Sequence, residues 1–239
     1  MFDMKIKTKE NDFFPNKGIK VYSILNYFQD AATDHAILIG LGYDQMIKDN
    51  MLWVVLRIRF DIYNDINYLD EINIETWPEP KSKVDFGRSY LIKDNQGNVL
   101  IRGKAVWVVI DSVKRKIVRS SEVIRYKDEY TQKSIYDEPI KKLEHIEYKN
   151  YKKVCTYKVK EEDIDLNGHM NNTKYAKIVF DSINVSNRKI ISGQIDFINE
   201  ARLNDLIDIY VIDSKDKIKS CGIINDKISF ELDVELKGC

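Results

Sequence analysis

The sequence predicts an α+β fold made of two similar units in tandem. The chain has 239 residues, which is enough for two units of about 100–120 residues each. Only four prolines and ten glycines interrupt it, so long regular elements are expected. Each half also repeats one order of elements, a strand, a helix and then four strands. We therefore expect each helix to lie against the concave face of its own antiparallel sheet.

In the first half, the period of the apolar residues changes after the helix. The first predicted strand is Gly18–Leu25. Tyr27–Leu41 has helical spacing with one buried face, and Gly40 and Gly42 end it. The next segments are rich in β-branched and aromatic residues that partly alternate with polar ones. They predict four antiparallel strands, at Met51–Tyr63, Glu71–Trp77, Gly87–Lys93 and Val99–Asp111.

The second half follows a polar stretch without clear periodicity, at about residues 128–150. A strand is predicted at Tyr151–Lys160 and a helix at Asn171–Ser182. Four more strands are predicted at Ile191–Ile198, Leu206–Asp213, Ile218–Ile224 and Ile228–Leu236. The predicted domains are accordingly residues 1–130 and 151–239, with residues 131–150 as the connector.

Charge and cysteine content exclude several classes of protein. The 38 Lys and Arg residues balance 38 Asp and Glu residues, so the chain lacks the basic excess of a nucleic-acid binder. No run of 18 apolar residues could span a membrane, and the charged start lacks a signal-peptide core, so we expect a cytoplasmic protein. The cysteines are far apart and form no CxxC pair, which predicts neither a disulfide framework nor a metal site; they are Cys155, Cys221 and Cys239.

The densest polar cluster joins the second-half strand to its helix. Asp165, Asn167 and His169 alternate there in a loop, so their side chains can converge on one side. Gly168 allows a backbone turn that a side chain would block. Asn171 or its neighbour can cap the helix, whose free amides could stabilise an oxyanion. A helix cap alone does not require an acid, an amide and an imidazole, so we expect a catalytic loop.

Residues 165–175 (DLNGHMNNTKY) resemble the D-x-N-x-H-x-N-N-x-x-Y signature of the fatty acyl-ACP thioesterases. Further segments resemble landmarks of this family in the same order, and the matches run from about residue 18 to 210; they are Asp34–Ala36, Trp53, Ile58–Tyr63, Ile74–Trp77 and Gly87–Asp94. The resemblance implies two tandem hotdog domains, each a long helix wrapped by an antiparallel β-sheet.

The resemblance also implies four catalytic residues and no cofactor. Three come from the loop, and the fourth matches a glutamate in the next strand; they are Asp165, Asn167, His169 and Glu200. Glu200 would activate water with His169 assisting proton transfer, and Asn167 would orient the water or the carbonyl. Asp165 either orients its neighbours or attacks the thioester. Many plant members carry a cysteine where this chain has Ala201, so that cysteine cannot be required here.

The implied function is hydrolysis of the thioester of fatty acyl-[acyl carrier protein], which releases free fatty acid and terminates chain elongation. Acyl carrier protein is then the partner, with no nucleic acid and no membrane involved. One alternative is an acyl-CoA thioesterase, although the single-hotdog type is about half this length. The other is a non-catalytic acyl-binding hotdog module. Chain-length and saturation preference stay open, as does a homodimer formed by edge-to-edge pairing of hotdog sheets.

The first half lacks a counterpart of the catalytic loop. We expect His35 to be a packed or hydrogen-bonded helix residue, and the first domain to form the acyl-chain pocket with an apolar helix face of Ala31, Ala32, Leu38 and Ile39. Because acyl carrier protein is strongly acidic, a local basic surface is also expected. Its candidates are Lys114, Arg115 and Lys116 with Arg119, and Lys81 with Lys83 and Arg88.

Overall fold

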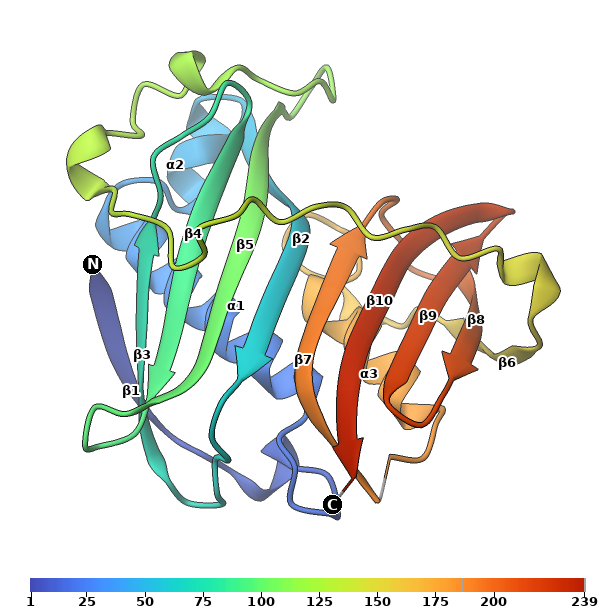
Figure 1. The fold of residues 1–239 in the computed structure, drawn as a ribbon. Coiled ribbons are helices and arrows are strands. Elements are labelled where there is room, and N and C mark those ends of the chain that lie inside the picture. Colours follow the sequence, from blue (N-terminus) through green and yellow to red (C-terminus); the bar gives the residue numbers. More distant parts are fainter. Residues whose placement is uncertain (186, 239) are drawn as a thin grey trace. The chain divides into compact units, whose positions relative to one another are not determined.

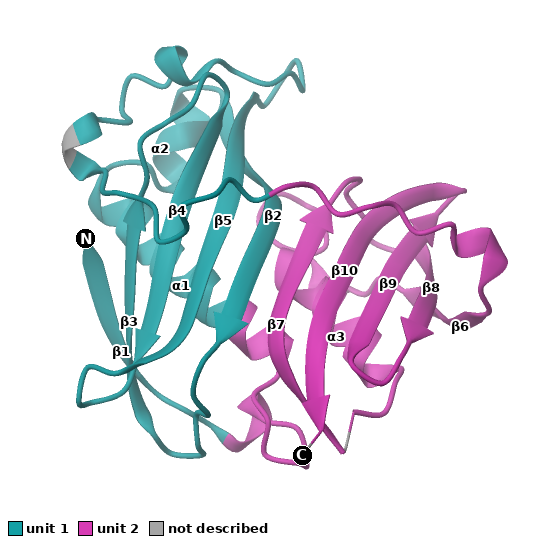
Figure 2. Cartoon of the chain, viewed as in Figure 1, with its two compact units in different colours: residues 1–9, 26–140 teal, residues 10–25, 141–239 magenta. Residues whose placement is uncertain are grey.

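The computed structural model describes residues 1–185 and 187–238, which group into two compact units (Figure 2). Unit 1 contains residues 1–9 and 26–140, and unit 2 contains residues 10–25 and 141–239. Within unit 2, Asn16 Nδ2 donates to the carbonyl oxygens of Val185 (3.0 Å) and Arg188 (2.9 Å), and the Phe14 ring meets Phe180. Residues 10–25 thus group with residues 141–239 in the structure. The predicted domain limits stay a prediction.

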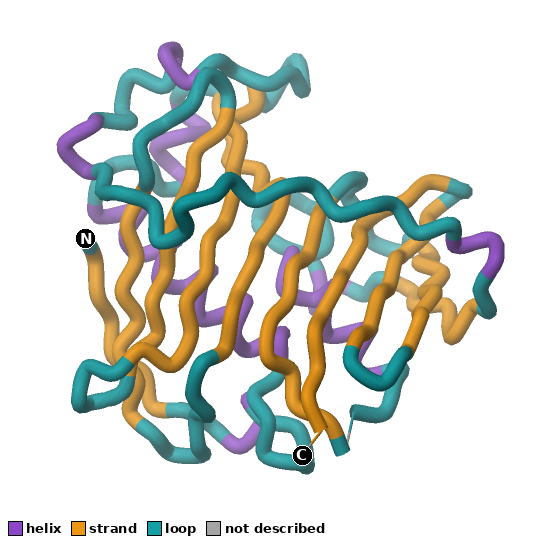
Figure 3. Tube along the Cα trace, in the orientation of Figure 1, coloured by secondary structure: helices purple, strands orange, loops and turns teal. Residues whose placement is uncertain are grey.

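Unit 1 is a five-stranded antiparallel sheet with a long helix on one face (Figures 1 and 3). The strand order is β1-β3-β4-β5-β2. The bounds are β1 Phe2–Lys7, α1 Val21–Leu38, α2 Tyr43–Lys48, β2 Met51–Ile62, β3 Glu71–Pro78, β4 Asp85–Lys93 and β5 Val99–Asp111. The Phe28 ring of α1 stacks on Tyr90 of β4 at 4.3 Å and fills the space left by Gly103 of β5. This packing fixes the helix against the sheet.

Unit 2 repeats the arrangement with a shorter helix. Its antiparallel strand order is β7-β10-β9-β8-β6. The bounds are β6 Lys153–Lys158, α3 Asn172–Asp181, β7 Arg188–Phe197, β8 Leu206–Asp213, β9 Lys217–Ile224 and β10 Lys227–Gly238. Tyr175 of α3 contacts Phe197 and Phe230 with ring centroids 5.7 and 5.1 Å apart. The prediction of two hotdog domains, each a helix packed on an antiparallel sheet, is confirmed.

The eight strands predicted after the two helices are confirmed to within three residues, but the start of the chain differs. Gly18–Leu25 is not a strand, because α1 begins at Val21. Val21, Ile24 and Leu25 are buried and continue the helical stripe that leads to Phe28. Their β-branched and aromatic neighbours resemble a strand when read locally. The actual first strand, β1, alternates half-buried apolar residues with exposed charged ones, which is the pattern of a half-buried strand, but it was not predicted.

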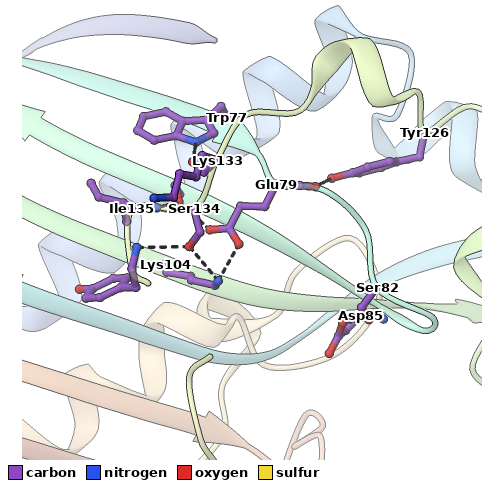
Figure 4. A network of polar contacts seen from close by, with 11 residues as sticks. Trp77, Glu79, Ser82, Asp85, Lys104, Tyr126, Lys133, Ser134 and Ile135 are labelled. Atoms are coloured by element: carbon purple, nitrogen blue, oxygen red, sulfur yellow. Dashed lines mark hydrogen bonds and ion pairs between the residues drawn. The ribbon is translucent and has the colours of Figure 1, made fainter. Parts of the chain in front are cut away.

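The first part of the connector, residues 131–140, lies on the face of the unit 1 sheet opposite α1 and covers charged residues that are buried there (Figures 1 and 4). Glu79 and Lys104 form an ion pair at 2.6 Å with only 6% and 11% of their side chains exposed. Ser89 Oγ donates to Glu79 at 2.6 Å and accepts from the Ile135 amide at 3.0 Å. Lys104 Nζ also donates to Ser134 Oγ at 3.0 Å. These polar groups fasten an extended segment that has no strand partner of its own.

In unit 2, two further buried carboxylates hold the rest of the connector. The amide of Leu143 donates to Asp196 (3.1 Å), and that of Ile146 donates to Glu231 (2.9 Å). His145 Nδ1 also lies 2.9 Å from Glu231. The buried acids Asp196 and Glu231 are thus used by the fold and are not candidates for catalysis. Among the described residues, no helix combines the length and apolar character needed to cross a bilayer.

Candidate active site

The predicted catalytic loop is anchored at both ends by Asp163. This residue closes the short 3-10 helix Glu161–Asp163 and is 4% exposed. Its carboxylate accepts from Tyr157 Oη at 2.7 Å and from the Lys160 amide at 3.0 Å. Its carbonyl accepts from the amide of Asn171 at 2.7 Å, at the start of α3. The segment between β6 and α3 is therefore a closed loop with fixed ends.

Inside the loop, Asp165 holds the backbone of the residues that follow it. Its Oδ1 accepts from the amides of Asn167 (2.8 Å) and His169 (3.3 Å). Its own amide donates to the His169 carbonyl at 2.8 Å, and Gly168 turns the chain with a φ of 76°. This left-handed conformation favours glycine. Asp165 thus acts on the shape of the loop and on the position of His169.

A second segment, which follows β7, brings Glu200 to this loop. The Met170 amide donates to the Ala201 carbonyl at 2.8 Å, and the Ala201 amide donates to Tyr175 Oη at 3.0 Å. Met170 and Ala201 are buried, so the two segments are clamped side by side. As a result, His169 Nε2 lies 3.0 Å from Glu200 Oε2. Tyr175 ends the sequence signature, but its role in holding Ala201 was not predicted.

The four predicted residues differ in how they contribute to this arrangement. Glu200 and His169 are in direct contact, with 35% and 14% of their side chains exposed. This half-open position suits a base that must reach water. Asp165 binds the loop backbone, and Asn167 is exposed, with its Nδ2 3.5 Å from Asp165 Oδ2. The structure therefore joins two of the four as a pair and places the other two beside it.

The start of α3 was expected to offer free amides to an oxyanion. Asn171 is the N-cap, and its side-chain oxygen accepts from the Thr173 amide at 2.9 Å. The Asn171 amide is itself bound to the Asp163 carbonyl. Capping by Asn171 is confirmed, and two of the amides expected at the oxyanion are already used within the fold.

Cys221 is too deeply buried to act as a nucleophile. Cys221 is fully buried, and burial, with a smaller contribution from Glu231, raises the pKa of its thiol to about 12. A thiolate is the reactive form, so this thiol is unreactive near neutral pH. Cys155 is half-buried on β6, and Cys239 lies outside the described residues. Ala201 follows Glu200 in the chain, so no thiol stands directly after the carboxylate.

His35 is buried in unit 1 and belongs to the packing of α1. Its Nδ1 accepts from the Arg88 guanidinium at 3.1 Å, and its ring stacks on Phe2 at 5.5 Å. Burial lowers the pKa of His35 to about 4, assisted by the positive charges of Arg88 and the amino terminus. His35 is therefore neutral at pH 7, as a hydrogen-bonded helix residue. Arg88 is itself buried and binds Thr76, so its expected place on a basic surface is wrong.

The lowered pKa of His35 predicts a loss of stability in acid. The unfolded chain binds a proton at this histidine below about pH 6.5, whereas the folded chain resists it until about pH 4. The contribution of neutral His35 to the stability of the fold is thus fully present above pH 6.5 and is lost as the pH falls toward 4. When the pH falls from 7 to 4.5, the free energy of unfolding in urea should decrease by on the order of 2 kcal/mol more for the wild type than for His35→Gln. An equal pH dependence in both proteins would contradict this assignment.

Comparison of the sequence with known protein families identifies the family of this chain. The acyl-ACP thioesterase N-terminal domain matches residues 1–127, and the acyl-ACP thioesterase C-terminal domain matches residues 146–237. The chain belongs to the acyl-ACP thioesterase family. The resemblance first seen in residues 165–175 is thereby confirmed. The loop and Glu200 lie within the part that matches the C-terminal domain of this family.

Two plant proteins are similar to this chain in sequence. The chloroplastic oleoyl-acyl carrier protein thioesterase 2 of Arabidopsis thaliana is 26% identical over 218 residues, covering 81% of this chain and 58% of the relative. The chloroplastic palmitoyl-acyl carrier protein thioesterase of the same plant is 25% identical over 193 residues, covering 76% of this chain and 47% of the relative. The chain thus spans about half the length of these relatives.

Solved structures show the same fold. The 12:0-ACP thioesterase from Umbellularia californica has a TM-score of 0.90 and 19% identity, covering 100% of this chain and 97% of the other. An acyl-ACP thioesterase from Bacteroides thetaiotaomicron has a TM-score of 0.83 and 20% identity, covering 99% and 97%. At these identities the likeness concerns the fold.

Proposed function

We propose that this chain is an enzyme that hydrolyses the thioester of a fatty acyl group carried by acyl carrier protein, releasing the free fatty acid. The contact of His169 Nε2 with Glu200 Oε2 at 3.0 Å, in a chain of the acyl-ACP thioesterase family, carries the proposal. It pairs a carboxylate with an imidazole at a half-exposed site. A thioester is already electrophilic and has a good leaving group, so such a pair can supply the acid–base catalysis that hydrolysis needs.

In the proposed reaction, a water molecule attacks the carbonyl carbon of the thioester while Glu200 takes one of its protons. The tetrahedral intermediate collapses, the carbon–sulfur bond breaks, and the thiolate leaves. His169 assists the transfer of the proton toward the sulfur. The half-exposed carboxylate of Glu200 supports its role as the base, because water can reach it. Asn167, exposed on the same loop, would orient the carbonyl or the water.

Asp165 is proposed as a positioning residue and not as the nucleophile. The amides of Asn167 and His169 bind its Oδ1 and hold it toward the loop backbone. Asp165→Asn keeps an oxygen that can accept from both amides, so it should retain kcat within about tenfold, whereas Asp165→Ala should lose about 100-fold. The check is kcat for both variants. Equal and complete loss in both would instead assign Asp165 to attack on the thioester.

Unit 1 is proposed to bind the acyl chain, as the family resemblance implies. Ala31 and Ala32 are buried on the sheet-facing side of α1, and Ile39 is partly buried against an apolar cluster around Leu41. Leu38 is 72% exposed at the last residue of α1, so the expectation that it lines the pocket is wrong. Its place seven residues after Ala31 puts it on the same side of the helix, so the exposure belongs to the helix end and not to the helical period.

The decisive experiment measures kcat/KM for acyl-ACP and acyl-CoA substrates of several chain lengths. Faster turnover of acyl-ACP supports the proposal, and faster turnover of acyl-CoA supports the first alternative. Tight acyl binding without turnover of either supports a non-catalytic module. The same series gives the chain-length preference. A cytoplasmic location and a homodimer stay predictions.

A further inference from the structure

One end of unit 1 concentrates positive charge in a chain whose net charge is +0. Residues 112–127 (SVKRKIVRSSEVIRYK) contain six Lys and Arg residues and a single acidic residue, Glu122. This segment follows β5, and the loop between β3 and β4 lies beside it, because the Ser120 amide donates to the Lys83 carbonyl at 3.1 Å. Both loops lie at the same end of the unit 1 sheet (Figure 1). The structure thus joins two basic segments that the sequence separates.

Apolar side chains project from the same loops. Four of them are exposed, namely Val84 (42%), Val113 (77%), Ile117 (57%) and Ile124 (87%). Val123 and Tyr126, on either side of Ile124 and Arg125, are buried, and Tyr126 Oη donates to the Glu79 carbonyl at 2.6 Å. Ile124 is therefore held outward by a fixed backbone. Exposed aliphatic side chains on a fixed backbone are typical of a binding surface.

The charges that remain available on this surface are Lys83, Lys116 and Arg119. All three are exposed, and among the described residues none of them forms an ion pair. By contrast, Arg125 binds Asp49 at 2.5 Å, Lys114 lies 3.7 Å from Asp111, and Lys81 lies against the Tyr126 ring. The three unpaired cations and the four aliphatic side chains together define the basic loop surface.

We propose that the basic loop surface docks an acidic, amphipathic helix of the carrier protein that delivers the acyl substrate. The inference rests on the proposed function, which requires such a partner. Cations match the acidic residues of the partner, and the aliphatic side chains match its apolar positions. A membrane fits less well, because the surface is built from turns without exposed aromatic residues, whereas membrane-surface segments are amphipathic helices with aromatic anchors.

The test compares two charge-reversal variants, each of which replaces two cationic residues by glutamate. Lys116→Glu/Arg119→Glu changes the basic loop surface, and Lys5→Glu/Lys7→Glu changes exposed lysines on strand β1 of the same unit. Binding is measured with carrier protein that bears a non-hydrolysable acyl analogue, at low and high salt. The first variant should raise Kd about tenfold or more and weaken its salt dependence, with the second close to wild type. An unchanged Kd in the first variant, or equal loss in both, overturns the inference.

Turnover of a carrier-free acyl thioester, such as acyl-N-acetylcysteamine, separates docking from catalysis. This rate should be the same in the wild type and in Lys116→Glu/Arg119→Glu, and a matching loss there overturns the inference by showing damage to the fold. If no thioester is hydrolysed but the carrier still binds through these residues, the docking inference stands and the proposed function fails. Stronger retention on anionic vesicles than on carrier protein would overturn the inference in favour of a membrane.

Discussion

Replacing Glu200 by Gln, or His169 by Gln, is expected to lower kcat for acyl-thioester hydrolysis by about 10²–10⁴-fold. The two side chains are 3.0 Å apart, so each change removes one member of the acid–base pair while keeping its size. Gln at position 200 cannot take a proton from water, and Gln at position 169 cannot return one to the leaving sulfur. The measurement is steady-state kcat for an acyl-ACP substrate at saturating concentration.

Glu162→Gln is the matched control for this experiment. Glu162 is 71% exposed in the short 3-10 helix before the loop, so its loss should leave kcat within about twofold of wild type. Circular dichroism and urea unfolding should show that all three variants fold. Near-wild-type turnover in both Glu200→Gln and His169→Gln would remove the pair from the mechanism. If kcat instead falls in proportion to the loss of stability of the variants, the Glu200–His169 pair supports the fold and not the catalysis.

The largest effect on stability is expected from Lys104→Met. Lys104 forms the 2.6 Å ion pair with Glu79, and both side chains are nearly buried beneath the connector (Figure 4). Without the lysine, the Glu79 carboxylate keeps the Ser89 hydroxyl but has no counter-charge at this position. Breaking a buried pair in this way costs about 3–5 kcal/mol. The free energy of unfolding in urea should fall by that amount.

The double variant Glu79→Gln/Lys104→Met tests the cause of this loss. It removes both charges together, so it should be more stable than Lys104→Met alone by at least about 1 kcal/mol. Lys177→Met is the surface control, because Lys177 and Asp181 are 47% and 60% exposed. The free energy of unfolding of Lys177→Met should fall by less than about 1 kcal/mol. A double variant as unstable as Lys104→Met would show that the pair acts by packing and not by charge.

The catalytic loop is a local feature, and for that reason the sequence predicts much of it. The alternation of Asp165, Asn167 and His169 and the turn at Gly168 lie within five residues, and their backbone hydrogen bonds connect near neighbours. Glu200 lies 31 residues beyond His169, and the family resemblance, not spacing, identified it. The clamp between Met170 and Ala201 that brings it into place depends on pairing of distant segments.

The sequence by itself determined the two helices and the four strands after each of them, because the periods of strands and helices are properties of local side-chain order. It did not place the first strand of the first half, β1. Only the tertiary structure decided which charged residues are exposed. Arg88 and Lys83 are five residues apart, yet Arg88 is buried against His35 and Lys83 stands on the surface. Likewise, Glu79 and Lys104 are ordinary charged residues in the sequence and a buried pair in the fold. Burial depends on which distant segment covers a residue, and local sequence carries no record of that contact.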